Sequence, residues 1–223
     1  MSTATTKHED SRPALTRQRV VQAAIQHADA AGLDALTMRQ VAGMLGVAPM
    51  ALYRHIANRD DLIDEMVDVL FGEIVLPLGG VHWKTAMRDR ALSVRDVLAH
   101  HRWAIGLMES RRRPGPSNLR HHDAVIGKLR SAGFDVAMVA HAYSLLDGYI
   151  YGYALTKLNI PFETADEMAA MAQDMFEPFP TGDYPNLAEF IADHVMKPGY
   201  DYGEEFEYGL DLILRGLEEA LAG

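Results

Sequence analysis

The chain has 223 residues, contains no cysteine and carries a formal net charge of −10. The lack of cysteine excludes disulfides and thiolate metal sites, and no apolar run approaches the roughly 20 residues of a membrane helix. The polar start MSTATTKHEDSRP has no apolar core and is not a secretory signal. We therefore expect a cytoplasmic protein with no membrane partner.

The charge is distributed unevenly along the chain. Residues 1–10 carry −1 and residues 11–59 carry +4, which leaves −13 for residues 60–223. A basic amino-terminal segment on an acidic body is typical of a protein that meets nucleic acid at one end. The pattern is weak alone, because charge runs are more often solvated faces.

Helix formers dominate the sequence and alternating β-branched runs are scarce, so the sequence predicts an all-α fold. A disordered tail is expected over residues 1–13. Thr16 is a plausible N-cap of the first helix, Thr37 and Gln40 form a capping box for the second, and Asn58 caps the fourth. The helices are expected at about 17–31, 38–45, 49–56, 59–75, 83–100, 103–110, 118–132, 136–158, 164–176, 187–195 and 204–221.

The second and third of these helices have the proportions of a helix-turn-helix, with Gly46 and Val47 in the turn. The apolar residues that would face the first helix are Val41, Leu45, Val47, Leu52 and Ile56. This packing leaves the start and outer face of the third helix free to enter a major groove. The outward residues are then Arg39, Pro49, Met50, Ala51, Tyr53, Arg54 and His55. A bundle without a partner is the alternative interpretation.

The stretch GLDALTMRQVAGMLGVAPMALYRHIANRDDLID resembles the DNA-binding domain of the TetR family of bacterial transcriptional regulators. The shared features are a Gly after the first helix, Leu-Thr-x-Arg, the Leu-Gly-Val turn, Leu-Tyr-x-His and Asn-Arg at the fourth helix. Further along, SAGFDVAMVAHAYSLLDGYIYGYAL resembles the dimerisation region of the tetracycline repressors, and FEYGLDLILRGLEEAL resembles their closing helix.

The resemblance implies an all-α homodimer with a three-helix DNA-binding domain at 14–60 and a larger effector-binding and dimerisation domain at 61–223. Such a repressor holds a palindromic double-stranded operator until a small-molecule effector moves the fourth helix. Carried over by position, the DNA-binding residues are Thr37, Arg39, Pro49, Met50, Ala51, Tyr53, His55 and Arg59. The outward Arg54 is a further candidate for a base or phosphate contact. The family's pattern is broken by the small or apolar Ala48, Pro49 and Ala51, which suit thymine methyl groups.

Aromatic and polar residues in the later helices are the candidates for an effector site. They are Trp103, Met108, Tyr143, Asp147 and Tyr151, although each of them fits the core or a dimer contact equally well. By resemblance, Val75, Met108 and Thr156 occupy positions where tetracycline repressors hold a magnesium-chelated drug. The side chain of Val75 cannot bind magnesium and the thioether of Met108 is a poor partner for it, so we expect a different and fairly apolar effector.

Two histidine pairs invite an alternative interpretation as a helical metal-binding protein. Adjacent side chains on a helix point about 100° apart, so neither His100–His101 nor His121–His122 forms a chelate alone. A metal site would require His101 and His122 to meet across helices.

A DNA-binding protein without an effector is the other alternative. No enzyme motif is present, and no metal ligand or cofactor is assigned. The basic run RRRPGP is expected to pair with the acidic last third of the chain.

Overall fold

The computed structural model describes residues 14–161, 167, 170, 171, 174, 182–197 and 199–222. Over these residues the chain forms helices and connecting turns, with no strand, which confirms the predicted all-α fold. None of the helices described is long and apolar enough to span a bilayer. The predicted tail at 1–13 and most of the predicted helix at 164–176 lie outside the described residues.

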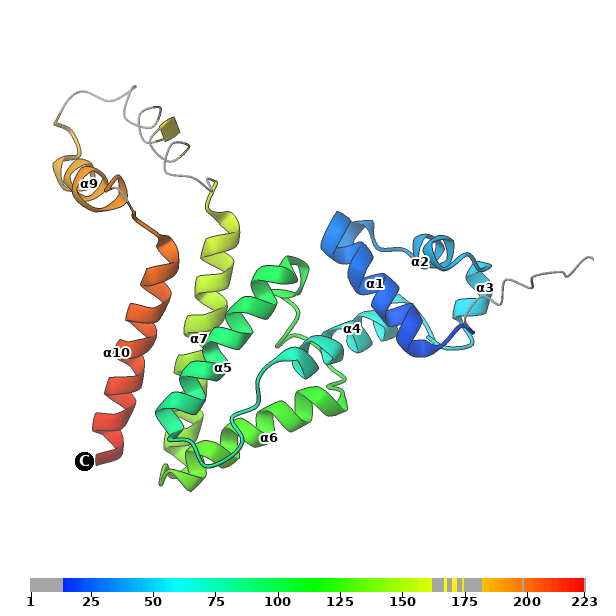
Figure 1. Cartoon of the computed structure of the whole chain (residues 1–223), viewed down its shortest axis with the longest axis horizontal. Coiled ribbons are helices and arrows are strands. Elements are labelled where there is room, and N and C mark those ends of the chain that lie inside the picture. Colours follow the sequence, from blue (N-terminus) through cyan, green and yellow to red (C-terminus); the bar gives the residue numbers. More distant parts are fainter. Residues whose placement is uncertain are drawn as a thin grey trace, which may run out of the picture.

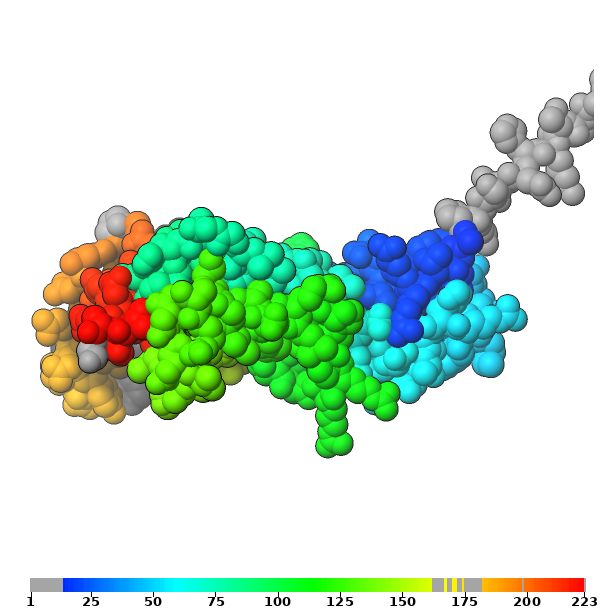
Figure 2. All heavy atoms as spheres, turned by 90° about the horizontal axis from the view of Figure 1, so that it is seen from below, coloured from blue at the N-terminus to red at the C-terminus, as the bar shows by residue number. Residues whose placement is uncertain are grey.

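The first three helices form a small lobe, here called the head, at one end of the molecule (Figures 1 and 2). They are α1 (Arg17–Ala31), α2 (Met38–Leu45) and α3 (Pro49–Leu52), with a short 3-10 turn at Leu33–Ala35. The predicted caps are confirmed: the Thr16 hydroxyl accepts the N–H of Arg19, and that of Thr37 accepts the N–H of Gln40. Gly46 adopts φ 66°, the left-handed conformation that glycine tolerates, and ends α2.

Helix α3 is shorter than the sequence predicts, because the helix ends at Leu52 and turns replace the expected last residues. The N–H groups of His55 and Ile56 both donate to the carbonyl of Leu52, at 2.8 and 3.0 Å. This tightened turn carries Ile56 back into the core, where it is fully buried beside Leu52. Burial of Leu52 and Ile56 therefore holds α3 and the turn after it in place. An isolated helix of four residues would not be stable.

Helix α4 (Arg59–Glu73) begins in the head and runs alongside α6 (Figure 1). The side chain of Asn58 accepts the N–H of Asp61, as predicted. Apolar residues on α4 are buried by α1 at its start and by α6 further along. The proposed domain boundary at residue 60 thus falls inside a helix that contacts both parts, and it stays a prediction.

The remaining helices form the larger lobe, here called the body. They are α5 (Trp83–His100), the 3-10 turn η2 (Arg102–Ala104), α6 (Pro116–Ser131), α7 (Val136–Asn159), α9 (Pro185–Phe190), the π-helical turn η3 (Ile191–Val195) and α10 (Tyr202–Ala222). Helix α7 packs against α5, α6 and α10. The Tyr149 hydroxyl donates to the carbonyls of Glu205 and Phe206, which joins α7 to α10.

One predicted helix, at 103–110, is wrong. After α5 the backbone leaves the helical region at His101, with φ −110° and ψ 62°, and only η2 and successive turns follow. Gly106 lowers the helix propensity of this short segment, and the Ser110 hydroxyl donates to the carbonyl of Leu107, a bond that competes with helix continuation.

Candidate functional site

The predicted DNA-reading residues of α2 and α3 lie on one exposed part of the head. Met50 is 74% exposed and Tyr53 is 46% exposed, and Thr37, Arg39, Pro49 and Arg54 are also exposed. Ala51 and His55 are half-buried beside the fully buried Leu52. The N-terminal end of α2, capped by Thr37, offers backbone N–H groups to a phosphate. The arrangement is chemically suited to a DNA groove, and the roles of the individual residues stay predictions.

Arg59 has partners within the head. Its Nε and Nη2 donate to the carbonyls of Leu36 and Leu33, at 2.9 and 2.8 Å, and its side chain is half-buried. These two bonds tie the first residue of α4 to the segment that precedes α2. Arg59 therefore braces the head, and its predicted phosphate contact stays a prediction.

A polar cluster lies inside the body, where α5, α6 and α7 meet. Arg90 of α5 is 1% exposed; its Nη2 lies 2.7 Å from Oδ1 of Asp147 on α7, and its Nε donates to Nε2 of His121 on α6 at 3.0 Å. The hydroxyl of Tyr143 shares a hydrogen bond with Nδ1 of His122. The Tyr151 hydroxyl donates to Glu109 at 2.9 Å. These seven residues are here called the body cluster.

The buried environment sets the charges of the body cluster. Burial, and then the neighbouring charge of Arg90, lower the pKa of His121 to about 3, so its ring is neutral at pH 7. Burial works against the Arg90 cation, but attraction by Asp147 and its other neighbours outweighs it and raises the pKa of Arg90. Burial raises the pKa of Asp147 although Arg90 opposes this shift, and burial likewise raises the pKa values of Tyr143 and Tyr151.

Two buried hydrogen-bond donors of the body cluster have no partner. Because the neutral His121 accepts at Nε2, its proton lies on Nδ1. Among the described residues, the buried side-chain atoms without a hydrogen-bond partner are Nη1 of Arg90, Nδ1 of His121 and Oδ1 of Asp147. The Asp147 oxygen forms the ion pair with Arg90, which leaves the two nitrogen donors. Buried donors normally have partners. An oxygen-bearing ligand would satisfy the two donors on Arg90 and His121.

The structure brings together three of the five predicted effector residues. Tyr143, Asp147 and Tyr151 lie on α7 within the body cluster, and Met108 is buried one residue before Glu109. Trp103 lies elsewhere, because its Nε1 donates to Asp29 of α1 at 2.7 Å.

Sequence reasoning missed Arg90 and the role of the second histidine pair. Arg90 falls at helical spacing with Ala86 and Val94, both buried, so a charge on an apolar stripe was the available signal. His121 and His122 do not act as a pair, since one contacts Arg90 and the other contacts Tyr143. The metal-binding alternative would have required His101 to meet His122, but His101 contacts Asp29 and Glu73 instead.

Helix α4 touches the body cluster and the loop before α6. The ring centroid of Phe71 lies 5.4 Å from that of His121 and 5.8 Å from that of His122. Arg111, in the basic run, pairs with Asp64 of α4 and not with the acidic last third of the chain as predicted. The loop folds back here because α6 packs along α4. The helix that starts in the head is therefore in contact with the body cluster.

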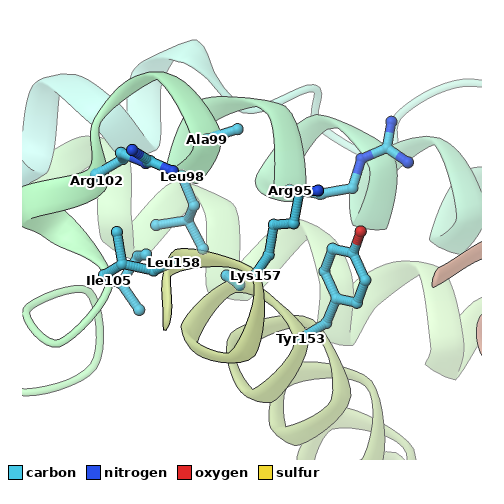
Figure 3. A pocket seen from close by; sticks show the side chains of 9 residues that line it. Arg95, Leu98, Ala99, Arg102, Ile105, Tyr153, Lys157 and Leu158 are labelled. Carbon is cyan, nitrogen blue, oxygen red and sulfur yellow. The ribbon is translucent and has the colours of Figure 1, made fainter. Parts of the chain in front are cut away.

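An open hollow of about 260 Å³ lies between α5, η2 and α7 (Figure 3). Its apolar residues include Leu98, Ile105 and Leu158 (Figure 3). Its cations are Arg95 of α5, Arg102 of η2 and Lys157 of α7. The hollow suits an amphipathic ligand with an anionic group. None of the five predicted effector residues lines it.

Residues 20–66 match a family model described as bacterial regulatory proteins, tetR family, and residues 76–221 match one described as tetracyclin repressor-like, C-terminal domain. The chain is 31% identical over 220 residues to the HTH-type transcriptional repressor DrrR1 of Streptomyces coeruleorubidus, covering 95% of this chain and 80% of the relative. It is 28% identical over 213 residues to the class D tetracycline repressor protein of Escherichia coli, covering 93% and 91%. The structure of the Streptomyces coelicolor protein ActR in complex with actinorhodin superposes with a TM-score of 0.76, at 28% identity, over 95% of this chain and 100% of that chain.

Proposed function

The chain belongs to the TetR family of bacterial regulatory proteins, and we propose that it leaves a near-palindromic operator when a small molecule binds its body cluster. It is a ligand-responsive, DNA-binding transcriptional repressor. It acts by differential binding, without catalysis: an effector that prefers one arrangement of the heads shifts the population towards it.

The observation that carries the proposal is the placement of α4. Its first residue, Arg59, holds the head segment before α2, and its Phe71 packs on the two histidine rings of the body cluster. A ligand that moved α6 or these rings would therefore act on the helix that positions the reading face. Thr37, Arg39, Tyr53 and their neighbours are proposed to contact the operator.

The proposed effector carries oxygen acceptors. The unpaired donors on Arg90 and His121 favour a carbonyl, carboxylate or phenolate oxygen, while the ring of Phe71 beside His121 offers apolar contact. We expect an apolar body with such a group at one end. A magnesium chelate of tetracycline is disfavoured, because Val75 is exposed and apolar and the Thr156 hydroxyl already donates to Gly152.

The proposed repressor is a homodimer, the usual state in this family. Large apolar side chains are exposed on both α7 and α10, among them Leu145, Leu155, Tyr208 and Leu212. Two adjacent helices with exposed apolar residues suit a helical interface with a second copy. Such an interface would set the distance between the two heads.

The experiment selects a duplex from random DNA with the full-length protein and measures its affinity by fluorescence anisotropy. We expect Arg39→Ala and Tyr53→Ala to lose specific binding, and the matched charge-removing variant Arg112→Ala, at an exposed position in the loop before α6, to keep it. The affinity for the duplex should fall steeply as the salt concentration rises.

A thermal-shift screen with oxygen-bearing aromatic compounds then identifies ligands. A ligand that stabilises the protein but never releases the duplex would leave the protein as an effector-independent DNA binder.

A further inference from the structure

The head and the body meet at a second group of polar side chains, which shares no residue with the body cluster. It comprises Asp29 of α1, Glu73 at the end of α4, His100 and His101 at the end of α5, and Trp103, and is here called the junction cluster. Nδ1 of His101 lies 2.7 Å from Oδ1 of Asp29, and its Nε2 lies 3.2 Å from Oε2 of Glu73. His101 is 4% exposed, so its ring is buried, whereas Asp29 and Glu73 are exposed to solvent.

Three of these residues can converge on one point. Asp29, His100 and His101 each offer a ligand atom, and the three atoms lie within 4.8 Å of one another. Two adjacent histidines on a helix would diverge, but His101 has left the helix, and its ring centroid lies 4.6 Å from that of His100 at an interplanar angle of 89°. Among the residues that the structure describes, this is the one group of three such side chains.

The surrounding contacts resemble the outer shell of a metal site. A histidine ligand characteristically donates its other ring N–H to a carboxylate, and a carboxylate ligand is itself hydrogen-bonded. Glu73 is placed to accept from Nε2 of His101, while the indole N–H of Trp103 donates to Oδ1 of Asp29 at 2.7 Å. These two contacts orient His101 and Asp29, and the exposed His100 completes the set.

The cluster is accessible from solvent. Asp29, His100 and Trp103 line an open groove of about 520 Å³, together with Asp34 and Arg102. The groove leaves room for a water molecule as the fourth ligand of a tetrahedral ion. Three carboxylates, on Asp29, Asp34 and Glu73, outnumber the one guanidinium of Arg102 here, so the local charge favours a cation.

We propose that the junction cluster binds a divalent transition metal of the zinc type through Asp29, His100 and His101, and so joins α1 of the head to the end of α5. Two imidazoles and one carboxylate suit zinc or cobalt, whereas magnesium and calcium prefer oxygen ligands alone. Because the ligands come from both lobes, occupancy would restrain the head independently of the effector.

The test uses the untagged full-length protein, stripped of metal with a chelator and titrated with Co²⁺ while its visible absorption is followed. We expect saturable absorption of a tetrahedral ion, displaced by Zn²⁺. His100→Gln and Asp29→Asn each remove one exposed ligand, and Asn keeps the shape of Asp29. Each variant should weaken Co²⁺ binding by at least about tenfold. His141→Gln, an exposed histidine on α7, is the matched control and should bind as the parent does.

Melting curves without metal verify that each variant is folded. The proposal is overturned if the parent shows no saturable absorption, if His100→Gln and Asp29→Asn both bind Co²⁺ like the control, or if His122→Gln is the variant that loses it. The absorption measurement needs neither operator nor effector. Its failure would therefore leave the proposed repressor function untouched, and a failure of operator binding would leave the metal site untouched.

Discussion

The carboxylate of Asp68 on α4 accepts the backbone N–H of Ser117 at 2.9 Å and thereby caps the start of α6. The same oxygen accepts the N–H of Asn118, also at 2.9 Å. Helix α6 has no cap of its own, because Gly115 stands at the N-cap position. A negative group at this end also favours the helix dipole. The helix that carries His121 is thus hydrogen-bonded to the helix that begins in the head.

Gly115 is required for this cap. A Cβ atom at this position would overlap the carboxylate of Asp68, so Gly115→Ala must displace Asp68 or the start of α6. We expect the free energy of unfolding to fall by about 1–2 kcal/mol, the usual cost of a lost cap. We also expect a weaker effect of a bound ligand on operator affinity, measured by anisotropy with and without the ligand.

Gly127→Ala is the control for that substitution. Gly127 lies exposed on the same helix, and a Cβ there would meet no atom within 4 Å. Since alanine is the better helix former, this variant should be as stable as the parent or up to about 1 kcal/mol more stable. Equal coupling in the two alanine variants would show that the Asp68 cap does not transmit the ligand's effect.

The buried pair of Arg90 and Asp147 should behave differently in single and double variants. Arg90→Met leaves Asp147 as a buried charge without a partner, so we expect a loss of about 3–5 kcal/mol in urea unfolding. The double variant Arg90→Met with Asp147→Leu removes both charges and should recover most of that loss. It should also lose ligand binding, because the Arg90 donor is gone.

Ligand binding by the stable double variant would argue against the body cluster as the effector site. The control is Lys157→Met, which removes a cation from the hollow between α5 and α7. We expect that variant to bind the effector as the parent does. The reverse result, in which only Lys157→Met loses the ligand, would place the effector in the hollow of Figure 3.

Local signals predicted most of the fold. Thr16, Thr37 and Asn58 cap the helices that the sequence assigned to them, because capping depends on residues within one turn. The start of α6 was predicted two residues late, since Pro116 occupies the first helical turn and the cap comes from Asp68, which accepts the N–H of Ser117 from 49 positions earlier in the chain. Contacts between distant segments leave no such local signal.

The same reason explains what was missed in the site. Tyr143, Asp147 and Tyr151 share one helix face at intervals of four, so their grouping was visible in the sequence. Their partner Arg90 lies on another helix, and Trp103 turns towards Asp29 because the backbone leaves the helix at His101. Neither contact follows from spacing.

Arg59 offers a test of bracing against phosphate binding. Arg59→Lys keeps the positive charge, but one ammonium cannot reproduce the paired bonds to Leu33 and Leu36. We expect a loss of about 1–3 kcal/mol in stability, the usual range for hydrogen bonds to a charged group. Arg54→Lys, at an exposed position of the head, should melt like the parent. If Arg59→Lys also melts like the parent, the carbonyl contacts contribute nothing and a phosphate role is the better account.

Acidification should destabilise the protein through His121. Burial and the charge of Arg90 lower its pKa from 6.5 to about 3 in the folded chain. Between these values the unfolded chain binds a proton that the folded chain does not, so stability falls as the pH decreases. The expected contribution is up to about 1.4 kcal/mol per pH unit, and it vanishes above about pH 6.5.

The readout is the difference in slope between variants in urea unfolding from about pH 7 to about pH 5. His121→Gln should lose stability less steeply than the parent, whereas His141→Gln, which changes an exposed histidine, should follow the parent. The raised pKa of Asp147 acts in the opposite direction, because a folded-state carboxyl that holds its proton loses stability as the pH rises. The difference between the parent and His121→Gln in the slope of unfolding free energy against pH therefore isolates His121. Parallel slopes for the two proteins would mean that His121 is not buried as a neutral ring.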